Sequence, residues 1–281
     1  MQCDCDYVIS GREDLPAHYD NCSSLWEKHH PGKDILKNND GTVRLANDHL
    51  RSLEVDILYH LGLDTHNYDL PALFGDVKHG IGIPSMTTVL QEVIKLVSYA
   101  KVKDPIFFRI GTSGGLAIPA GSVVVSTWGL SCVMEKSYDF PVLGKLRRLP
   151  SLLDSRVSQE VHSLATESDG FSTYLGGTVA ADDFYRGQGR LDGPFCDYTE
   201  NDKMAFLNKL TKLGVKNIEM EATAFAAFTR EAGIRAGIVC VTFLNRLLGD
   251  QVTTSKATLT EWQKRPMIVV GRYIARYLNK K

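Results

Sequence analysis

Three short segments of the sequence carry side chains that could bind a small polar substrate. The first is RIGTSGG at residues 109–115, in which Arg109 interrupts an apolar run and Thr112 follows it. A guanidinium, a hydroxyl and glycines that let backbone amides approach suit an oxyanion such as phosphate. The segment lacks the lysine of a Walker loop and the glycine spacing of a dinucleotide fingerprint. It therefore indicates an anion site, the alternative being a plain strand-to-loop turn with a solvated arginine.

The second segment is FYRGQGR at residues 184–190, where Gln188 and Arg190 stand two residues apart. In an extended segment their side chains would point the same way. Gln188 offers a paired donor and acceptor and Arg190 only donors, which together match a planar ring with carbonyls beside an N–H. Phe184 could pack on such a ring. Taken alone, a glycine-rich loop with polar residues is more often simply a loop.

In the third segment, Glu219 and Glu221 flank Met220 where a strand is expected to give way to a helix. Negative charge is favoured at the start of a helix. Carboxylates also accept hydrogen bonds from sugar hydroxyls, and a thioether packs on the apolar face of a sugar. The alternative is a glutamate that stabilises the helix start beside a core methionine.

Alternating strands and helices must position these segments. Apolar runs predict strands over 106–110, 122–126, 173–179, 217–220 and 236–244. Helical spacing predicts helices over 46–61, 86–97 (capped by Ser85), 152–165, 199–213, 221–232 and 266–278, with loops at 111–115 and 183–193. The alternation indicates an α/β fold whose sheet is covered by helices on both faces. In such folds ligands bind at the carboxyl ends of strands, here 109–115, 217–221 and 244–246.

Composition excludes several classes of protein. The chain has 281 residues and a formal net charge of -1, so nothing favours nucleic acid or an anionic membrane as a partner. Its longest apolar runs, about nine residues, are too short to span a bilayer. Six scattered cysteines favour a reduced, cytoplasmic protein. Residues 1–45 predict a flexible extension and residues 46–281 a single domain.

The N-terminal region holds several potential metal ligands, and zinc stays open as an alternative to a tail without metal. Their spacing matches no pattern of two paired ligand arms, so we expect no metal site. They are Cys3, Cys5, His18, Cys22, His29 and His30.

Several long stretches occur, in this order, between about Asp56 and Leu278: DILYHLGL, LPALFGDVK, HGIGIPS, RIGTSGG, DFYRGQGRLDG, YTENDK, GVKNIEMEATAFAAF and CVTFLNRLLGDQ. Through them, and in the same order, the chain resembles the animal uridine phosphorylases. The resemblance implies a three-layer α/β/α nucleoside phosphorylase-like fold with a mixed central sheet. It also implies a pentosyltransferase reaction, in which phosphate converts uridine to uracil and ribose 1-phosphate without a metal or organic cofactor.

The same resemblance implies a role for each matching residue. Phosphate would be bound by Arg109 and Thr112, uracil by Gln188, Arg190 and Phe184, and ribose by Glu219, Met220, Glu221 and His60. Of these, the catalytic residues would be Arg109, Gln188, Arg190 and Glu221.

Two further positions bear on assembly and substrate. His60 matches a histidine that reaches the ribose site of the neighbouring subunit, which implies a homodimer or a larger assembly. Asn245 and Arg246 stand where purine-specific relatives place an aspartate, which favours a pyrimidine nucleoside. The choice among uridine, deoxyuridine and thymidine stays open.

The chain departs from the family at one junction, where Lys78 is joined directly to His79. Relatives carry a further segment there, with a Gly-Gly phosphate loop, two phosphate-binding arginines and part of a strand. We therefore expect a sheet that lacks a strand and has unpaired ladder groups. The alternatives to a working uridine phosphorylase are a non-catalytic isoform, which misfolds or pairs with an intact subunit, and a nucleoside hydrolase.

Overall fold

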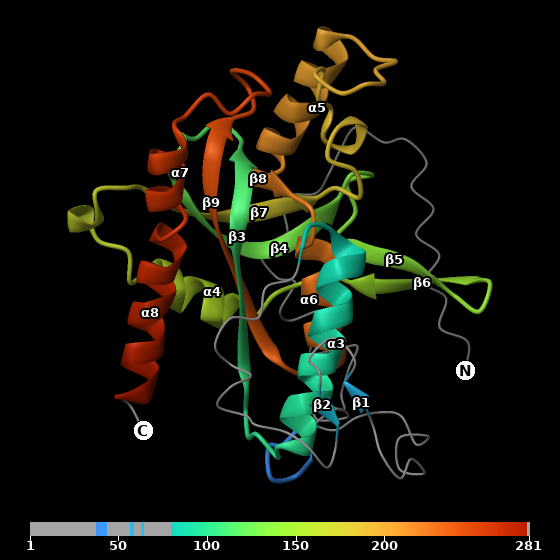
Figure 1. Ribbon diagram of the computed structural model, residues 1–281, viewed down its shortest axis with the longest axis vertical. Helices are drawn as coiled ribbons and strands as arrows, with labels where there is room; N and C mark the ends of the chain where they lie inside the picture. The colour runs from blue at the N-terminus through green and yellow to red at the C-terminus, as the bar shows by residue number, and fades with distance from the viewer. Residues whose placement is uncertain (1–37, 44–56, 59–62, 65–79, 280–281) are drawn as a thin grey trace. The chain divides into compact units, whose positions relative to one another are not determined.

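The computed structural model describes residues 38–43, 57–58, 63–64 and 80–279 (Figure 1). Its helices are α3 (Ile83–Tyr99), α4 (Ser155–His162), α5 (Glu200–Lys212), α6 (Ala222–Glu231), α7 (Lys256–Trp262) and α8 (Arg265–Leu278). Its strands are β1 (Ile57–Leu58), β2 (Leu63–Asp64), β3 (Ile106–Gly115), β4 (Val123–Ser131), β5 (Ser137–Val142), β6 (Lys145–Pro150), β7 (Thr173–Ala180), β8 (Val215–Glu219) and β9 (Arg235–Asn245).

Five strands form a closed barrel in the order β3-β8-β7-β4-β9. β3 is parallel to β9, β4 to β7 and β7 to β8, whereas β4 is antiparallel to β9 and β3 to β8. The expected α/β class with a mixed central sheet is confirmed. Closure was not expected. The expected loss of a strand relative to the family stays a prediction, because the junction at residues 78–79 lies outside the described residues. The ring closes through only two residue pairs, Gly114 with Ile218 and Gly115 with Asn217.

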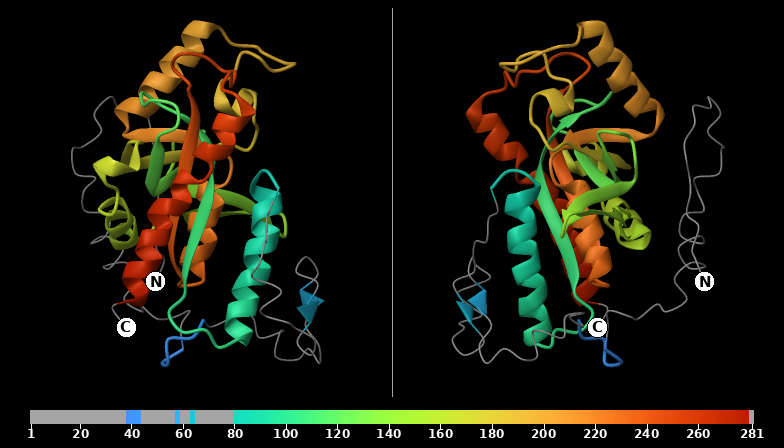
Figure 2. Two further views of the ribbon diagram at one scale, coloured as in Figure 1. Left: turned by 60° about the vertical axis from the view of Figure 1, so that its left-hand side comes forward. Right: turned by 90° about the vertical axis from the view of Figure 1, so that its right-hand side faces the viewer.

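Helices surround the barrel and form separate cores with it. Figure 1 shows α4 and α8 on one side, α3 and α6 on the other and α5 at one end. α3 runs beside β3 in every view, including both views of Figure 2. Phe107 of β3 packs against the core that α3 and α6 share, while Val157 and Val269 bring α4 and α8 together on the other side. None of the described helices is long and apolar enough to cross a membrane.

Local signals set the ends of α5. Thr199 caps its first turn and forms a capping box with Asp202, and Gly214 follows with a positive φ of 83°. The prediction that Ser85 caps the helix now seen as α3 is wrong. α3 begins at Ile83. Its N-cap residue is Gly82, whose φ is 91° and which has no side chain to cap the helix.

Several other predictions differ from the structure. Residues 111–115 were expected to form a loop, but β3 continues through them because they pair with β9 as far as Gly115. The β5–β6 hairpin and α7 were not expected. Within the helix expected over 46–61, Ile57–Leu58 forms β1 instead, and the remainder lies outside the described residues.

Part of the expected N-terminal extension is packed. In the described segment 38–43, Val43 belongs to the core and its carbonyl accepts a hydrogen bond from Ser98 of α3, at 2.9 Å. The rest of residues 1–45 lies outside the described residues, as does the Lys78–His79 junction. The division into an extension and a domain from residue 46 therefore stays a prediction.

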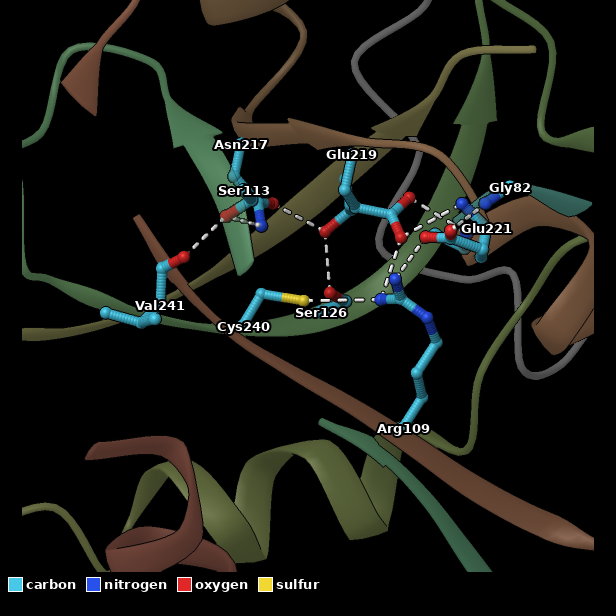
Figure 3. A network of polar contacts seen from close by, with 11 residues as sticks. Gly82, Arg109, Ser113, Ser126, Asn217, Glu219, Glu221, Cys240 and Val241 are labelled. Carbon is cyan, nitrogen blue, oxygen red and sulfur yellow. Dashed lines mark hydrogen bonds and ion pairs between the residues drawn. The ribbon is translucent and has the colours of Figure 1, made fainter. Parts of the chain in front are cut away.

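A row of polar side chains crosses the barrel interior (Figure 3). Ser126 of β4 bonds to Thr178 of β7 at 2.6 Å, and Thr178 donates to Asn217 of β8 at 2.7 Å. Asn217 donates to Ser113 of β3 at 2.9 Å, and Ser113 donates to the carbonyl of Val241 in β9 at 3.1 Å. All four side chains are buried, so each satisfies the polar group of a neighbour that water cannot reach.

Candidate active site

Arg109 lies at the centre of a buried charged cluster. Its guanidinium, 7% exposed, contacts Glu219 with Nη1 at 2.8 Å and forms an ion pair with Glu221 through Nη2. Nη1 also lies 3.4 Å from the sulfur of Cys240 (Figure 3). The structure thus brings together the arginine of RIGTSGG and both carboxylates of the Glu-Met-Glu segment. The partner that the buried arginine requires is the protein's own pair of glutamates.

The two glutamates hold different elements. Glu219 ends β8, and its carboxylate accepts the backbone N–H groups of Glu221 and Ala222 at 3.0 and 2.8 Å. It therefore satisfies the first free amides of α6. Glu221 accepts the N–H of Gly82 at 2.5 Å and so fixes the start of α3 to the start of α6. Met220, between them, is half-buried.

Burial controls the charges in this cluster. It raises the pKa of Glu219 to about 7, an effect that Arg109 opposes and the carboxylate of Glu221 reinforces. Burial lowers the pKa of Arg109, but Glu219, Cys240 and Glu221 together hold it above its usual value. Burial also raises the pKa of the Cys240 thiol to about 12, which keeps the thiol protonated. Glu219 therefore takes up a proton more readily than an exposed glutamate does.

Arg109 and Thr112 do not share a face of β3. Arg109 is buried, while Thr112 is exposed, as expected for residues three apart in a strand. The Nε atom of Arg109 is buried and has no hydrogen-bond partner in the described part of the chain. A joint role of these two residues in phosphate binding stays a prediction, and their present geometry gives it no direct support.

The loop at residues 184–190 is not extended. Its 3₁₀ turn, η4 (Arg186–Gln188), is followed by Gly189 with a φ of 63°, so Gln188 and Arg190 do not point the same way by strand geometry. Arg190 forms two bonds to Asp192, at 2.8 and 2.7 Å, and its guanidinium lies 4.4 Å from the ring centroid of Phe184. The expected pairing of Gln188 with Arg190 on one face is therefore wrong for this structure.

Gln188 instead bonds to Arg246, which follows β9. Nη1 of Arg246 donates to the side-chain oxygen of Gln188 at 3.3 Å, and Nη2 donates to the backbone carbonyl of Gln188 at 2.9 Å. Arg246 is 1% exposed and passes over Gly114 of β3, where a Cβ would lie 2.8 Å from its Cγ. Arg246 therefore contacts both Gln188 and β3, the strand that carries Arg109.

The ion-paired partners of Arg246 were not predicted from the sequence. Asp250 accepts from Arg246 at 3.0 Å and from Lys203 of α5 at 2.9 Å, and all three side chains are buried. A signal was available, because Arg246 directly follows an apolar strand, as Arg109 interrupts one. An acidic residue four positions later was a plausible partner for it.

An open pocket of about 280 Å³ lies beside the loop at residues 184–190. Its lining includes the loop's glycines and side chains of α5, but the Arg109 cluster does not line it. The lining residues are Cys132, Arg186, Gly187, Gly189, Tyr198, Asp202, Lys203 and Phe206.

Two expected features lie outside the described residues: His60 and the N-terminal group of cysteines and histidines. Within the described ranges, no three His, Cys, Asp or Glu side chains are grouped so that they could hold a metal ion. The role of His60 and the absence of a metal stay predictions.

The barrel, its mixed strand directions and the charged cluster around Arg109 define a class of protein. Residues 77–275 match the family described as the Phosphorylase superfamily, which spans more than half of the chain. Among relatives, a "Uridine and thymidine phosphorylase" from Caenorhabditis elegans is 39% identical, with 78% of this chain and 90% of that protein covered. The chain belongs to the uridine phosphorylase family.

Solved structures agree with this assignment. The uridine phosphorylase from Schistosoma mansoni in complex with uracil superposes with a TM-score of 0.77 at 35% identity, covering 82% of this chain and 98% of that one. A second protein of that organism, named "Inactive uridine phosphorylase B", is 32% identical, with 83% of this chain and 96% of that protein covered. Similarity at this level is thus found both with relatives named as uridine phosphorylases and with one named as an inactive uridine phosphorylase.

The matched lengths bear on the missing segment. The match with the C. elegans protein extends over 267 residues but covers 78% of this 281-residue chain, which is about 219 residues. The difference of about 48 positions is what an internal segment absent from this chain would produce. Its expected place at Lys78–His79 lies outside the described residues.

Proposed function

We propose that this chain catalyses the phosphorolysis of uridine, with inorganic phosphate as co-substrate and uracil and ribose 1-phosphate as products. The observation that carries the proposal is the buried contact of Arg109 with Glu219 and Glu221, in a chain of the uridine phosphorylase family. This contact unites a cation suited to phosphate with carboxylates suited to ribose hydroxyls. The complex of a relative with uracil supports a pyrimidine as the base.

In this proposal substrate binding exchanges the partners of Arg109. A phosphate dianion is repelled by two carboxylates, so one of them has to lose its charge or turn away before phosphate can approach. Burial raises the pKa of Glu219, so this carboxyl loses its charge more readily than an exposed glutamate does. A protonated Glu219 leaves Arg109 with unbalanced positive charge, while Glu221 turns from Arg109 to the hydroxyls of the ribose.

The base is read by Gln188. Its side-chain oxygen accepts from Arg246 and keeps a second lone pair, and its amide nitrogen has no partner among the described residues. An amide in this state can accept from a ring N–H and donate to the adjacent carbonyl, the edge that uracil presents. As the glycosidic bond breaks, negative charge develops on the leaving uracil, and the cations Arg190 and Arg246 stabilise it.

We propose that the reaction uses no cofactor and takes place in a cytoplasmic homodimer. Charge stabilisation by arginines supplies what a metal would otherwise provide, so the reaction needs no metal or organic cofactor. The resemblance at His60 supports a homodimer, and the composition supports a cytoplasmic location.

The test is a measurement of uracil release from uridine with and without phosphate. The proposal requires release that depends on phosphate and yields ribose 1-phosphate. Release without phosphate would instead identify a nucleoside hydrolase. A folded chain that releases no uracil under either condition would be non-catalytic. One S. mansoni relative carries the name of an inactive uridine phosphorylase.

A further inference from the structure

Asp250 lies at the junction of three segments that are distant in sequence. Its carboxylate accepts from Nε and Nη2 of Arg246, at 3.2 and 3.0 Å, after the end of β9. It accepts from Nζ of Lys203, in α5, at 2.9 Å, and from the backbone N–H of Leu191, in the loop, at 2.9 Å. One buried carboxylate therefore joins the loop, α5 and the end of β9.

The charge of Asp250 is needed to keep its neighbours in place. Arg246 and Lys203 are 1% and 5% exposed, and two buried cations without a carboxylate between them would be strongly unfavourable. Burial raises the pKa of Asp250, but the Leu191 N–H, Lys203 and Arg246 lower it by more than burial raises it. The pKa therefore falls below its ordinary value, and the carboxyl is ionised in the folded protein. The cluster is a fixed ionic joint.

The joint reaches the candidate base site through Arg246. An arginine only donates hydrogen bonds, so the group of Gln188 that faces Arg246 is its oxygen and the amide nitrogen points away. The backbone carbonyl of Gln188 is held by the same guanidinium, at 2.9 Å. Side chain and backbone of Gln188 thus depend on one arginine, and that arginine depends on Asp250.

We infer that Asp250 is a positioning residue for base recognition: through Arg246 and the Leu191 N–H it fixes the orientation of the Gln188 amide and the path of the loop. This inference rests on the proposed function, in which Gln188 reads the base. The inference also predicts which base the site prefers. A fixed amide favours a base with a carbonyl beside a ring N–H, as in uracil, over cytosine, whose corresponding ring nitrogen carries no hydrogen.

The experiment compares Asp250→Asn with Asp169→Asn. Asp169 is a matched control because it also accepts from an arginine, Arg272 of α8, and lies in neither the loop nor the joint. Asp250→Asn should weaken uracil binding about tenfold to a hundredfold, the effect of losing a hydrogen-bonded charge, and lower the uracil-to-cytosine affinity ratio. Asp169→Asn should change neither. Calorimetric titration measures both.

A second arm tests whether Asp250 acts through Gln188. In a Gln188→Ala background, Asp250→Asn should have little further effect on uracil affinity, because the amide that it orients is absent. Full additivity of the two losses would overturn the inference, as would an Asp250→Asn protein that binds uracil like the parent.

A third arm needs no ligand. Asp250→Asn should speed hydrogen exchange of backbone amides in residues 186–192, and Asp169→Asn should not. If the parent binds no uracil, the proposed function fails, and this measurement decides the positioning role alone. Unchanged exchange in that segment would then overturn it.

Discussion

Arg109 and Arg246 show how one buried charge determines the positions of its neighbours. Each lies in or directly after an apolar strand, where an unpaired charge would be costly. Each is accordingly held by carboxylates, Arg109 by Glu219 and Glu221 and Arg246 by Asp250. The need for partners is visible in the sequence. Which carboxylate forms the ion pair with each arginine depends on how distant segments of the chain pack together.

Replacing Gln188 with alanine should weaken uracil binding by about 1–3 kcal/mol, because the base edge and Arg246 both lose a partner in a buried place. Titration calorimetry with uracil measures the change. Gln91→Ala, at an exposed position of α3, is the control and should bind like the parent. A Gln188→Ala protein with parental affinity would remove this residue from the base site.

Glu219 should make stability depend on pH. Because its folded pKa of about 7 exceeds the ordinary 4.5, the folded protein keeps a proton that the unfolded chain loses between these values. The stabilisation is complete below about pH 4.5 and disappears as the pH rises to about 7. Glu219→Gln cannot titrate, so the free energy of unfolding of the parent should fall relative to this variant across that window.

Urea unfolding at a series of pH values measures the difference. Glu261→Gln, at an exposed position within α7, serves as the control and should leave the pH dependence of the parent unchanged. A parent and a Glu219→Gln variant that differ by a constant amount between about pH 5 and 7 would contradict the raised pKa.

At the scale of elements, short-range signals were predictable from sequence and long-range pairing was not. The Thr199 cap and Gly214 stop of α5 lie within one continuous segment, as does the apolar run of β9. In contrast, residues 111–115 extend β3 only because β9, far along the chain, pairs with them. The β5–β6 hairpin likewise had no strong alternation to reveal it.

The candidate site follows the same division. The meeting of Arg109 with Glu221 was anticipated from the rule that strand ends gather in an α/β fold, but the reason differs. Arg109 lies within β3, and β8 runs antiparallel to β3, so the end of β8 lies toward Arg109. The bond between Gln188 and Arg246 was not anticipated, because the loop was assumed to be extended. Its 3₁₀ turn reverses the direction of the side chain, and no local pattern distinguishes the two conformations.

β4 and β7 pack so closely at Gly177 that no side chain fits there. A Cβ on Gly177 would overlap the indole ring of Trp128. Gly177→Ala should therefore lower the free energy of unfolding by about 1–3 kcal/mol through overpacking. Gly271→Ala is a control of opposite sign. It lies in α8 with nothing within 4 Å of a new Cβ, so alanine should stabilise the helix by about 0.5–1 kcal/mol. Urea midpoints that move in the same direction for both variants would contradict this account of β4–β7 packing.

For the whole molecule, the missing segment determines the expected activity. The family resemblance assigns to it two arginines that hold phosphate, and a hydrogen bond to a charged group contributes about 1.5–3 kcal/mol. Their loss would cost about 3–6 kcal/mol, or roughly a hundredfold to ten-thousandfold in phosphate affinity or turnover. Inserting a relative's segment between Lys78 and His79 should restore that activity.

The measurement is uracil release at saturating phosphate, with the chain and the restored version assayed side by side. An insertion of equal length made of glycine and serine controls for chain length alone, and it should not raise the rate. Equal rates for the chain and the restored version would show that the segment is dispensable.

The polar row inside the barrel has a consequence for how the strands align. Moving any one of β3, β4, β7 or β8 by a single residue would turn its polar side chain from the interior to the outer face. The neighbours of that side chain would then be buried without a partner, at about 1–3 kcal/mol for each group. Apolar side chains penalise a shift less sharply, because one aliphatic contact can replace another. The hydrogen bonds of this polar row therefore favour a single alignment of strands that come from distant parts of the chain. The side chains involved are Ser113, Ser126, Thr178 and Asn217.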